Sequence, residues 1–582
     1  MSSLSKSRAL LAGIAVAAAL LAAPALSGAS NASVSGGELR YLAAAGETND
    51  LTISVVGANF ILDDPGATII PGAGCAAVNL NRVSCAAAAV DDGIRAELGN
   101  LNDELLLTDS VPELASSILL RGEAGNDTIT SLSDGRIRAF GGIGNDTLIG
   151  GPGGDRLEGE DGDDTAAGNG GNDFFVSSPG TDSANGGPGS DDFEAGSVVD
   201  GPDNFIGGTG FDSVSYRGRL SPIVASLDGV GDDGELGEGD SIGTDVEEVD
   251  GGNGADTISG NEADNDLSGD EGNDTISGGG GDDRVNGSGG TDAVSGGPGN
   301  DRVEGDAGAD SISGEQGDDV FSFEAFDGFA DQISGGVGID TYRDSSVSGL
   351  TIDLDGVADD GFRNPLEGPA IDNVGADLEN IIVTESADDI LTGNNSANQI
   401  EGGAGNDRIN GLGGPDALLG DAGDDFLNGG PGIDSLDGAG GVDRLRTRDR
   451  SPDEASCGSA SDILLADQLD DFSVACDRSS TGALLKSRTA RLKKGRAKLT
   501  VSCPAAEGID CKVKLTASKG RKTLATGAGK VKSGKTSKVT LKLTRAGRKA
   551  RSKKLSLRTR TVLTDATGAK VTTTVPKLVL SR

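Results

Sequence analysis

Acidic side chains recur in this chain at a fixed interval of nine residues. From Gly251 the sequence reads GGNGADTIS, GNEADNDLS, GDEGNDTIS, GGGGDDRVN and continues in the same phase to residue 322. The sixth position of the unit is Asp in 18 of 20 copies, and the other two copies carry Asn265 and Asn398. A carboxylate is a hard oxygen donor, so a fold that stacks these units would build sites for a hard, oxygen-preferring cation.

The other positions of the unit predict the fold that would do the stacking. Position 1 is Gly in all copies except at Ser177, and position 4 is Gly in all except at Ala263 and Ser396. Glycine tolerates positive φ, so the first six residues can form a tight turn. Position 8 is apolar in every copy, and the three residues around it favour a short strand with that side chain on one face. Two units would then form one turn of a flattened coil, which predicts an all-β solenoid.

The phase is kept in three blocks, residues 141–194, 251–322 and 393–446, which hold 6, 8 and 6 units. In each block, aspartates of units n and n+2 would face each other across a gap with glycine carbonyls beside them. This donor set suits calcium better than zinc or copper. Glycine at every third residue, as in collagen, is absent, and no βαβ context surrounds the accidental GxGxxG matches. A disordered glycine-rich linker is the remaining alternative, and the unbroken apolar position 8 argues against it.

These repeats resemble the RTX, or haemolysin-type, calcium-binding repeat, whose fold is a parallel β-roll; the resemblance covers roughly residues 99–446. It implies calcium held between successive turns by the position-6 aspartates and by loop carbonyls. If each ion needs units n and n+2, the blocks form about 4, 6 and 4 complete sites, up to about 14. The ligands implied within the blocks are Asp146, Asp155, Asp164, Asp173, Asp182, Asp191, Asp256, Asp274, Asp283, Asp292, Asp301, Asp310, Asp319, Asp407, Asp416, Asp425, Asp434 and Asp443. Flanking units would add partial sites at Asp127, Asp203, Asp212, Asp331 and Asp340.

Charge divides the chain into an acidic part and a basic part. Residues 486–582 hold 28 Lys and Arg but only three acids, a charge of +25, which leaves −69 for the rest of a chain whose total is −44. Stacked carboxylates repel one another without a cation, so we expect folding of the roll to be coupled to calcium binding. Asn265 and Asn398 lie near block starts, where we expect weak or absent sites, so the block interiors should load first.

The N-terminus and the cysteines indicate an exported protein. Residues 1–32 have Lys6 and Arg8 before an apolar run and then small residues, which predicts a secretory signal peptide cleaved near Ala29 or Ala32. No later segment is long enough to span a membrane as a helix. RTX proteins of Gram-negative bacteria usually carry an uncleaved C-terminal export signal, and this chain departs from that pattern, which argues against a haemolysin-like toxin.

Six cysteines are expected to form disulfides in an exported chain, and free thiols are the alternative. Proximity favours three local pairs, although fifteen pairings are formally possible. No pair has the C-x₂₋₄-C spacing of a zinc site. The pairs favoured by proximity are Cys75 with Cys85, Cys457 with Cys476, and Cys503 with Cys511.

The remaining segments are interpreted as caps, spacers and a second domain. Residues 33–98 predict a β-rich N-terminal cap, and residues 447–485 a C-terminal cap of the roll. Two spacers, 195–250 and 323–392, share the sequences LDGVGDDG (from Leu227) and LDGVADDG (from Leu354), and most of their acids are expected to lie in solvated loops. Residues 486–582 alternate as strands, which predicts a small antiparallel, Ig-like β-sandwich with lysines facing solvent.

One motif in the basic segment is a decoy. Gly529–Thr536 reads GKVKSGKT and formally matches a phosphate-binding loop. A strand pattern follows it instead of a helix, so we expect a hairpin turn and no nucleotide. The positive charge of this segment suits contact with an anionic cell-envelope polymer or with nucleic acid, and the absence of Phe, Tyr and Trp from the segment argues against nucleic acid.

The chain contains no histidine, which removes HExxH zinc sites, Ser-His-Asp triads and Cys-His dyads. We therefore expect no enzyme and no catalytic residue. The sequence predicts a secreted calcium-binding β-roll protein with a structural or adhesive role at the cell surface. A secreted calcium buffer without a specific partner, or a hydrolase that uses only carboxylates, is the alternative.

Overall fold

A computed structural model describes residues 28–114, 118–323, 329–362, 372–458, 462–466 and 470–472 of the protein. It also describes the backbone of 489–491, 496–502, 511–519, 522–531, 536–544, 554–564 and 570–581. Most of the predicted signal peptide, Cys476 and Cys503 lie outside these residues. The chain divides into two compact units, residues 1–191 and 192–582, which are described one at a time.

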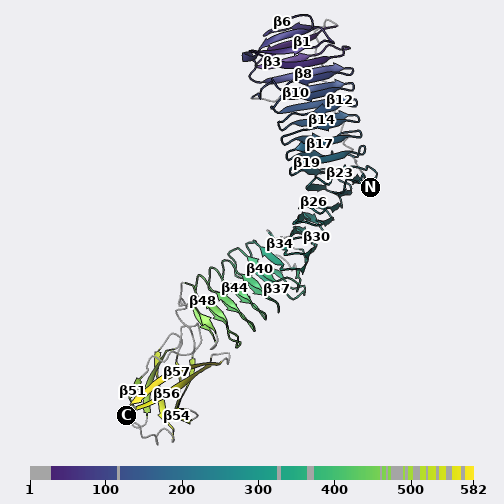
Figure 1. Cartoon of the computed structure of the whole chain (residues 1–582). Helices are drawn as coiled ribbons and strands as arrows, with labels where there is room; N and C mark the ends of the chain where they lie inside the picture. The colour runs from purple at the N-terminus through teal and green to yellow at the C-terminus, as the bar shows by residue number, and fades with distance from the viewer. Residues whose placement is uncertain are drawn as a thin grey trace, which may run out of the picture. The chain divides into compact units, whose positions relative to one another are not determined.

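The first unit is a parallel β-solenoid that begins with an antiparallel cap. Its strands return on two parallel sheets, and pairing within the repeats advances by one 18-residue turn, as in Leu157 with Phe175 and Leu148 with Ala166. Figure 1 shows these strands stacked as successive coils. One sheet contains β8 (Gly93–Asn100), β10 (Ile118–Ala124), β12 (Ile137–Ile143), β14 (Arg156–Asp161) and β16 (Phe174–Val176). The other contains β9 (Glu104–Leu107), β11 (Thr128–Ser131), β13 (Thr147–Ile149), β15 (Thr165–Ala167) and β17 (Ser183–Pro188).

The predicted β-rich cap is present at the start of this unit. β1 and β2 form an antiparallel pair, and β2 joins the first sheet beside β8. A second antiparallel set follows the order β3, β4, β7, β6, and a disulfide joins Cys75 in β6 to Cys85 in β7. The strands are β1 (Ser30–Ser35), β2 (Glu38–Leu42), β3 (Asp50–Val56), β4 (Asn59–Asp63), β6 (Cys75–Ala77) and β7 (Arg82–Ala86). Cys75–Cys85 is therefore confirmed as a local pair.

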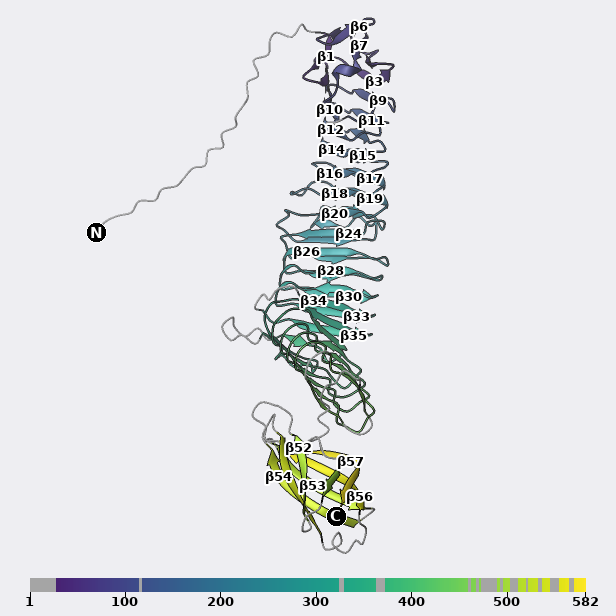
Figure 2. The same cartoon turned by 90° about the vertical axis from the view of Figure 1, so that its left-hand side faces the viewer.

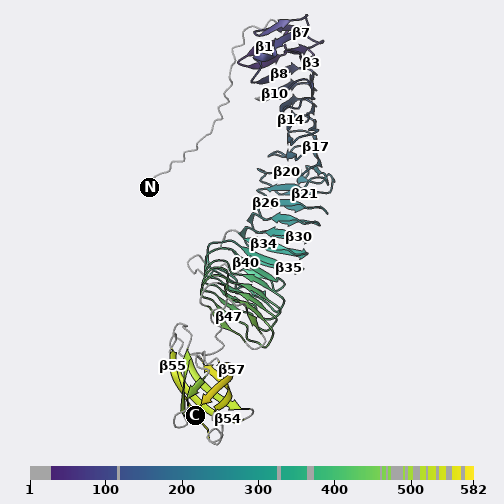
Figure 3. The ribbon, with the colours of Figure 1, turned by 60° about the vertical axis from the view of Figure 1, so that its left-hand side comes forward.

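The second unit is also a parallel coil, and it contains the second and third blocks. One sheet runs through β20 (Ser213–Ser215), β24 (Glu248–Gly252), β26 (Asp266–Gly272), β28 (Arg284–Asn286), β31 (Arg302–Glu304), β34 (Val320–Phe323), β36 (Thr341–Asp344), β40 (Asn380–Val383), β42 (Gln399–Glu401), β44 (Ala417–Leu419), β46 (Ser435–Asp437) and β48 (Glu454–Ser456). Figures 2 and 3 show these coils from two further directions.

The facing side of the second unit is built mainly from two separate sheets. The first contains β21 (Ile223–Ser226), β25 (Thr257–Ser259), β27 (Thr275–Ser277), β30 (Ala293–Pro298), β33 (Ser311–Gln316) and β35 (Gln332–Val337). The second contains β37 (Leu350–Asp353), β41 (Ile390–Thr392), β43 (Arg408–Asn410), β45 (Phe426–Asn428), β47 (Arg444–Arg446) and β49 (Ile463–Leu465). The change of sheet falls in the second spacer.

Position 8 of the repeat supplies the core, as the sequence predicts. Ile258, Leu267, Val285 and Val303 are completely buried between the two sheets. The alternation of a strand puts position 8 inward and positions 7 and 9 outward, so a three-residue strand is long enough to close the turn. In the described part of the chain there is no α-helix, and thus none that is long and apolar enough to cross a bilayer.

The basic segment forms a seven-stranded sheet in the order β51, β57, β56, β53, β54, β55, β52. Its strands are β51 (Thr489–Arg491), β52 (Arg496–Ser502), β53 (Cys511–Lys519), β54 (Lys522–Val531), β55 (Thr536–Leu543), β56 (Lys554–Thr564) and β57 (Lys570–Ser581). All pairs are antiparallel except β51 with β57. Thr536 of the GKVKSGKT motif begins a strand instead of a helix, as expected. The Ig-like sandwich itself stays a prediction.

Candidate metal centre

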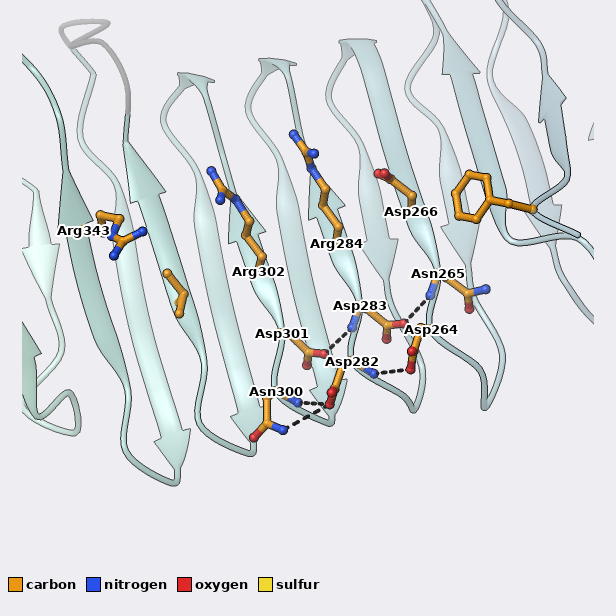
Figure 4. Close-up of a pocket in the computed structure, with 12 residues that line it drawn as sticks. Asp264, Asn265, Asp266, Asp282, Asp283, Arg284, Asn300, Asp301, Arg302 and Arg343 are labelled. Carbon is orange, nitrogen blue, oxygen red and sulfur yellow. Dashed lines mark hydrogen bonds between the residues drawn. The ribbon is translucent and has the colours of Figure 1, made fainter. Parts of the chain in front are cut away.

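The position-6 aspartates form ladders along the edges of the coil. In each step, Oδ1 accepts a hydrogen bond from the backbone N–H of the equivalent residue one turn earlier. The N–H of Asp146 donates to Asp164 at 2.7 Å, and the N–H of Asp274 donates to Asp292 at 2.8 Å. Figure 4 shows one such ladder, in which Asn265 donates to Asp283 and Asp283 donates to Asp301. The fold therefore brings units n and n+2 together, as the spacing predicts.

The second carboxylate oxygen of most ladder residues is buried and accepts no hydrogen bond. Burying such an oxygen in its charged form costs several kcal/mol unless a cation or donor compensates, because water no longer solvates it. Such Oδ2 atoms belong to Asp127, Asp146, Asp164, Asp173, Asp274, Asp283, Asp292, Asp301, Asp319, Asp340, Asp407, Asp416, Asp425, Asp434 and Asp443. Most turns thus place a carboxylate oxygen without a hydrogen-bond donor at the edge of the coil. A row of cation sites requires such oxygens at regular intervals.

Backbone carbonyls complete the oxygen environment beside position 1. A Cβ added at Gly287 would lie 2.8 Å from Oδ2 of Asp292 and 2.9 Å from the carbonyl oxygen of Gly305 in the next turn. The same two kinds of oxygen lie over Gly141, Gly278 and Gly411. Only glycine leaves this space open, which explains why position 1 is so uniform. The donors are carboxylate and carbonyl oxygens, which fit calcium and do not fit soft or nitrogen-preferring metals.

Burial changes the protonation of these aspartates in the metal-free protein. Desolvation raises the pKa of Asp173, Asp283 and Asp443 to about 7, although the accepted backbone hydrogen bond lowers it in part. Desolvation also raises the pKa of Asp146 and Asp425 to about 6. A divalent cation would favour the ionised form, so metal binding at neutral pH should release protons.

A family model for the RTX calcium-binding nonapeptide repeat matches residues 140–200, 243–330 and 383–448. These stretches contain the three blocks in which the ladders were found. The chain carries RTX calcium-binding repeats. No curated protein matches the chain.

Three of the predicted RTX ligands have both carboxylate oxygens in hydrogen bonds. Asp155 and Asp256 begin ladders, and their Oδ2 atoms accept the N–H groups of Gly151 and Gly252. Asp182 follows Ser177, the one unit without Gly at position 1, and its Oδ2 accepts the N–H of Ser178 at 3.4 Å. These three carboxylates therefore depend less on a cation than those of the block interiors.

The sequence did not predict several ladder residues, because their units lack the glycines at positions 1 and 4 of an RTX repeat. Oδ1 of Asp103 accepts the N–H of Asn49, and Oδ1 of Asp453 accepts the N–H of Asp434. Asp389 and Asp462 occupy equivalent places. In each case the acid lies two residues before a buried apolar residue, such as Leu105 after Asp103. That spacing, without the glycines, is the signal that could have found them.

Spacer acids continue the ladders where RTX units are missing. Glu247 accepts the N–H of Asp212 at 2.8 Å, and Glu379 accepts the N–H of Asp340 at 3.0 Å. Asp240 accepts the N–H of Asp203, and Asp372 accepts that of Asp331. A longer carboxylate arm, or a longer loop, thus replaces the nine-residue unit at these points.

The two asparagines at position 6 are held by the spacers that precede them. The side-chain amide of Asn398 donates to the carbonyl of Glu379 at 2.8 Å, and that of Asn265 points to the carbonyl of Glu247 at 3.4 Å. An aspartate could not donate in this way. The expected weak calcium binding at these two turns stays a prediction.

Most spacer acids are not in solvated loops, contrary to the sequence-based expectation. In the first spacer Asp233, Glu238 and Asp240 are buried, while Asp228 and Asp232 are exposed. In the second spacer Asp360 is buried, and its two oxygens accept the N–H groups of Asp353 and Val374. The expectation failed because the sequence pattern does not show that these loops fold back onto the coil.

The buried acid Glu238 of the first spacer is paired with a buried cation of the chain. Arg219 is completely buried and donates to both oxygens of Glu238, at 2.9 and 2.8 Å, and to the carbonyls of Ala195 and Gly196. Burial alone would raise the pKa of Glu238, but the hydrogen bonds from Arg219 hold it below its usual value. Tyr216 donates to Asp240 at 3.1 Å. No metal is needed to satisfy this cluster.

The structure describes one cysteine of each of the two other predicted pairs. Cys457 is buried and disulfide-bonded, while its expected partner, Cys476, lies outside the described residues. The backbone of Cys511 lies in β53, and Cys503 is outside the described residues. The pairs Cys457–Cys476 and Cys503–Cys511 therefore stay predictions.

Proposed function

We propose that this protein is an extracellular calcium-binding repeat protein whose β-roll folds when it binds Ca²⁺, with a structural or adhesive role at the cell surface. The supporting observation is the row of buried Oδ2 atoms that accept no hydrogen bond, such as those of Asp274, Asp283 and Asp292. We assign the ligand role to the predicted position-6 aspartates and to the glycine carbonyls beside them. Asp103 and Asp453, whose Oδ2 atoms are in the same condition, join this set.

The energetic scale supports coupled folding. At an assumed Kd of ~10⁻⁴ M and ~1 mM free calcium, one site stabilises the folded state by about 1.4 kcal/mol. About a dozen such sites would exceed the stability of an ordinary domain, which is about 5–15 kcal/mol. Calcium at extracellular concentrations would therefore decide whether the roll is folded.

Export belongs to the same proposal, and the structure bears on the cleavage site. β1 begins at Ser30, and both Ser30 and Ala32 are completely buried. Cleavage after Ala29 would leave this strand whole, whereas cleavage after Ala32 would remove half of it. We therefore favour Ala29. Contact between the basic C-terminal segment and an anionic envelope polymer remains part of the proposal.

The test is circular dichroism of the mature full-length chain. After exhaustive chelation the strand signal should be largely lost, and a calcium titration should restore it, whereas magnesium at the same concentration should not. Calorimetry of the same titration should show several ions bound per chain, with proton release. A strand signal that chelation leaves unchanged would contradict calcium-coupled folding.

A further inference from the structure

The outward faces of the two sheets differ in the third block. Along β43, β45 and β47 the position-7 side chains stand in one row, because Arg408 is in register with Phe426 and Phe426 with Arg444. The position-9 row beside it contains Asn410, Asn428 and Arg446. No acidic residue occurs on β41, β43, β45, β47 or β49. We call the six named side chains the arginine face.

The cations of the arginine face are not neutralised by neighbours. Arg408, Arg444 and Arg446 are exposed, and none of them forms an ion pair with any residue that the structure describes. Some strand arginines elsewhere on the roll do have acidic partners. Arg302 pairs with Glu304 at 2.7 Å, and Arg156 pairs with Glu158. The partner in those strands is the residue two positions on, which at the arginine face is Asn410 or Arg446.

The arginine face also offers a ring and amides. Phe426 is half-buried, and the guanidinium of Arg408 lies 5.3 Å from the centre of its ring. Asn410 and Asn428 are half-buried and joined by a side-chain hydrogen bond, which leaves further donors and acceptors at the surface. Guanidinium groups bind carboxylates and sulfates, rings stack on sugar faces, and amides match hydroxyls.

The spacing of the cations favours one class of polymer. Arg408 and Arg444 are two strands apart, which is roughly 9.5 Å in a parallel sheet, with Phe426 between them. A polysaccharide that carries an anionic group on every second sugar would place its charges over the two arginines and the intervening ring over Phe426. Single-stranded nucleic acid fits less well, because it uses successive aromatic platforms and Phe426 is the one aromatic residue on β41, β43, β45, β47 and β49.

We propose that the arginine face binds an anionic polysaccharide with alternating charged sugars. This inference rests on the proposed function, since the strands that align Arg408, Phe426 and Arg444 belong to the calcium-folded roll. It names a partner class and a surface distinct from the basic C-terminal sheet. The facing sheet of the same turns presents Gln399, Ala417 and Ser435 in the corresponding row and carries no cation there.

The test compares two double variants of the full chain that change net charge equally. Arg408→Ala with Arg444→Ala removes two positive charges from the arginine face. Gln399→Glu with Ser435→Glu, on exposed side chains of the facing sheet, adds two negative charges with the same two-strand spacing. The probe is a labelled hyaluronan oligosaccharide in saturating calcium, and the same oligosaccharide with methyl-esterified carboxyls is its neutral counterpart. Binding by the basic C-terminal segment contributes equally to both variants.

The arginine variant should weaken binding about tenfold, because two charge-assisted contacts are lost, whereas the facing-sheet variant should change it less than about twofold. Phe426→Leu should weaken binding about threefold with the charge unchanged, and the neutral ester should bind poorly to all proteins. Equal effects of the two double variants, absence of hyaluronan binding, or tighter arginine-dependent binding of a single-stranded oligonucleotide would overturn the inference. Circular dichroism in the same buffer separates the two claims: a normal calcium response with failed binding refutes only the arginine face, and no calcium response refutes the proposed function as well.

Discussion

The repeat turns and the loop of the first spacer around Asp233 and Glu238 bury acids in opposite ways. In the repeats, Asp283 accepts one backbone hydrogen bond and leaves Oδ2 buried without a donor. In the first spacer, Glu238 is paired with Arg219, and both oxygens of Asp233 accept backbone N–H groups. Both kinds of acid are dehydrated, but only the second kind is compensated within the chain. Burial of an acid therefore does not by itself indicate a metal site, and a buried carboxylate oxygen without a hydrogen-bond donor is the stronger indication.

The two regions therefore differ in what stabilises them. The first spacer can hold its structure through internal hydrogen bonds and the ion pairs of Arg217 and Arg219, so it can act as a fixed segment between blocks. Under the proposed function the RTX turns depend on an external cation, so we expect calcium to control their folding. Changes in pH and sequence should therefore affect the two regions differently.

The largest difference is expected from pH in calcium-free solution, since it acts on every RTX turn at once. Burial raises the pKa of Asp283 and Asp319 to about 7. A folded-state pKa above the unfolded value stabilises the fold at low pH, and that stability is lost as pH rises through the folded pKa. Lowering the pH from about 8 to about 5 without calcium should therefore increase the strand signal in circular dichroism. With saturating calcium the signal should be nearly constant, and a metal-free signal independent of pH would contradict this account.

The next largest effect is expected in the first spacer. Arg219→Met leaves the buried carboxylate of Glu238 without its partner and should lower local stability by about 3–5 kcal/mol, even in saturating calcium. Hydrogen exchange of β21 and β25 would measure the loss. Arg217→Met is the matched control, because Arg217 is 63% exposed although it also pairs with acids, and its cost should be below about 1 kcal/mol. Rescue of Arg219→Met by excess calcium would show that the spacer behaves like a repeat.

A pair of isosteric changes should separate the two regions directly. Asp283→Asn removes a charged oxygen that has no donor, so calorimetry should detect fewer bound calcium ions, and the metal-free fold should become easier to form. Asp233→Asn replaces one acceptor oxygen that already has a donor, so calcium stoichiometry should stay the same while stability falls by about 1–3 kcal/mol. The same outcome for both variants would remove the distinction between the regions.

The smallest effect is expected where a block meets its spacer. Asn265→Asp removes the side-chain N–H that contacts the carbonyl of Glu247. The Oδ1 atom at this position can still accept the N–H of Asn261. Stability should fall by about 1 kcal/mol or less, and no further ion should bind. An added calcium ion in calorimetry would show that the Asn265 turn differs from a working site only by its missing charge.

The repeat region could be predicted well because each of its positions has one local task. Gly287 must leave room for two oxygens, Val285 must enter the core, and Asp292 must reach the ladder. The type of each residue therefore predicts its position in the fold. The spacers could not be predicted in this way. Arg219 lies 19 residues from Glu238 in sequence, and nothing about either residue indicates the pairing.

The sequence by itself determined the period, the parallel coil, the identity of the core and the gathering of oxygen donors at position 6, because these follow from a nine-residue pattern repeated in phase. Only the tertiary structure decided which carboxylates are compensated, that Asp103, Asp453 and Glu247 extend the ladders, and that Arg408 and Arg444 form no ion pair with a residue that the structure describes. The physical reason is that compensation of a charge depends on the atoms brought within hydrogen-bond distance of it. In the spacers those atoms come from residues that are distant in sequence and follow no period.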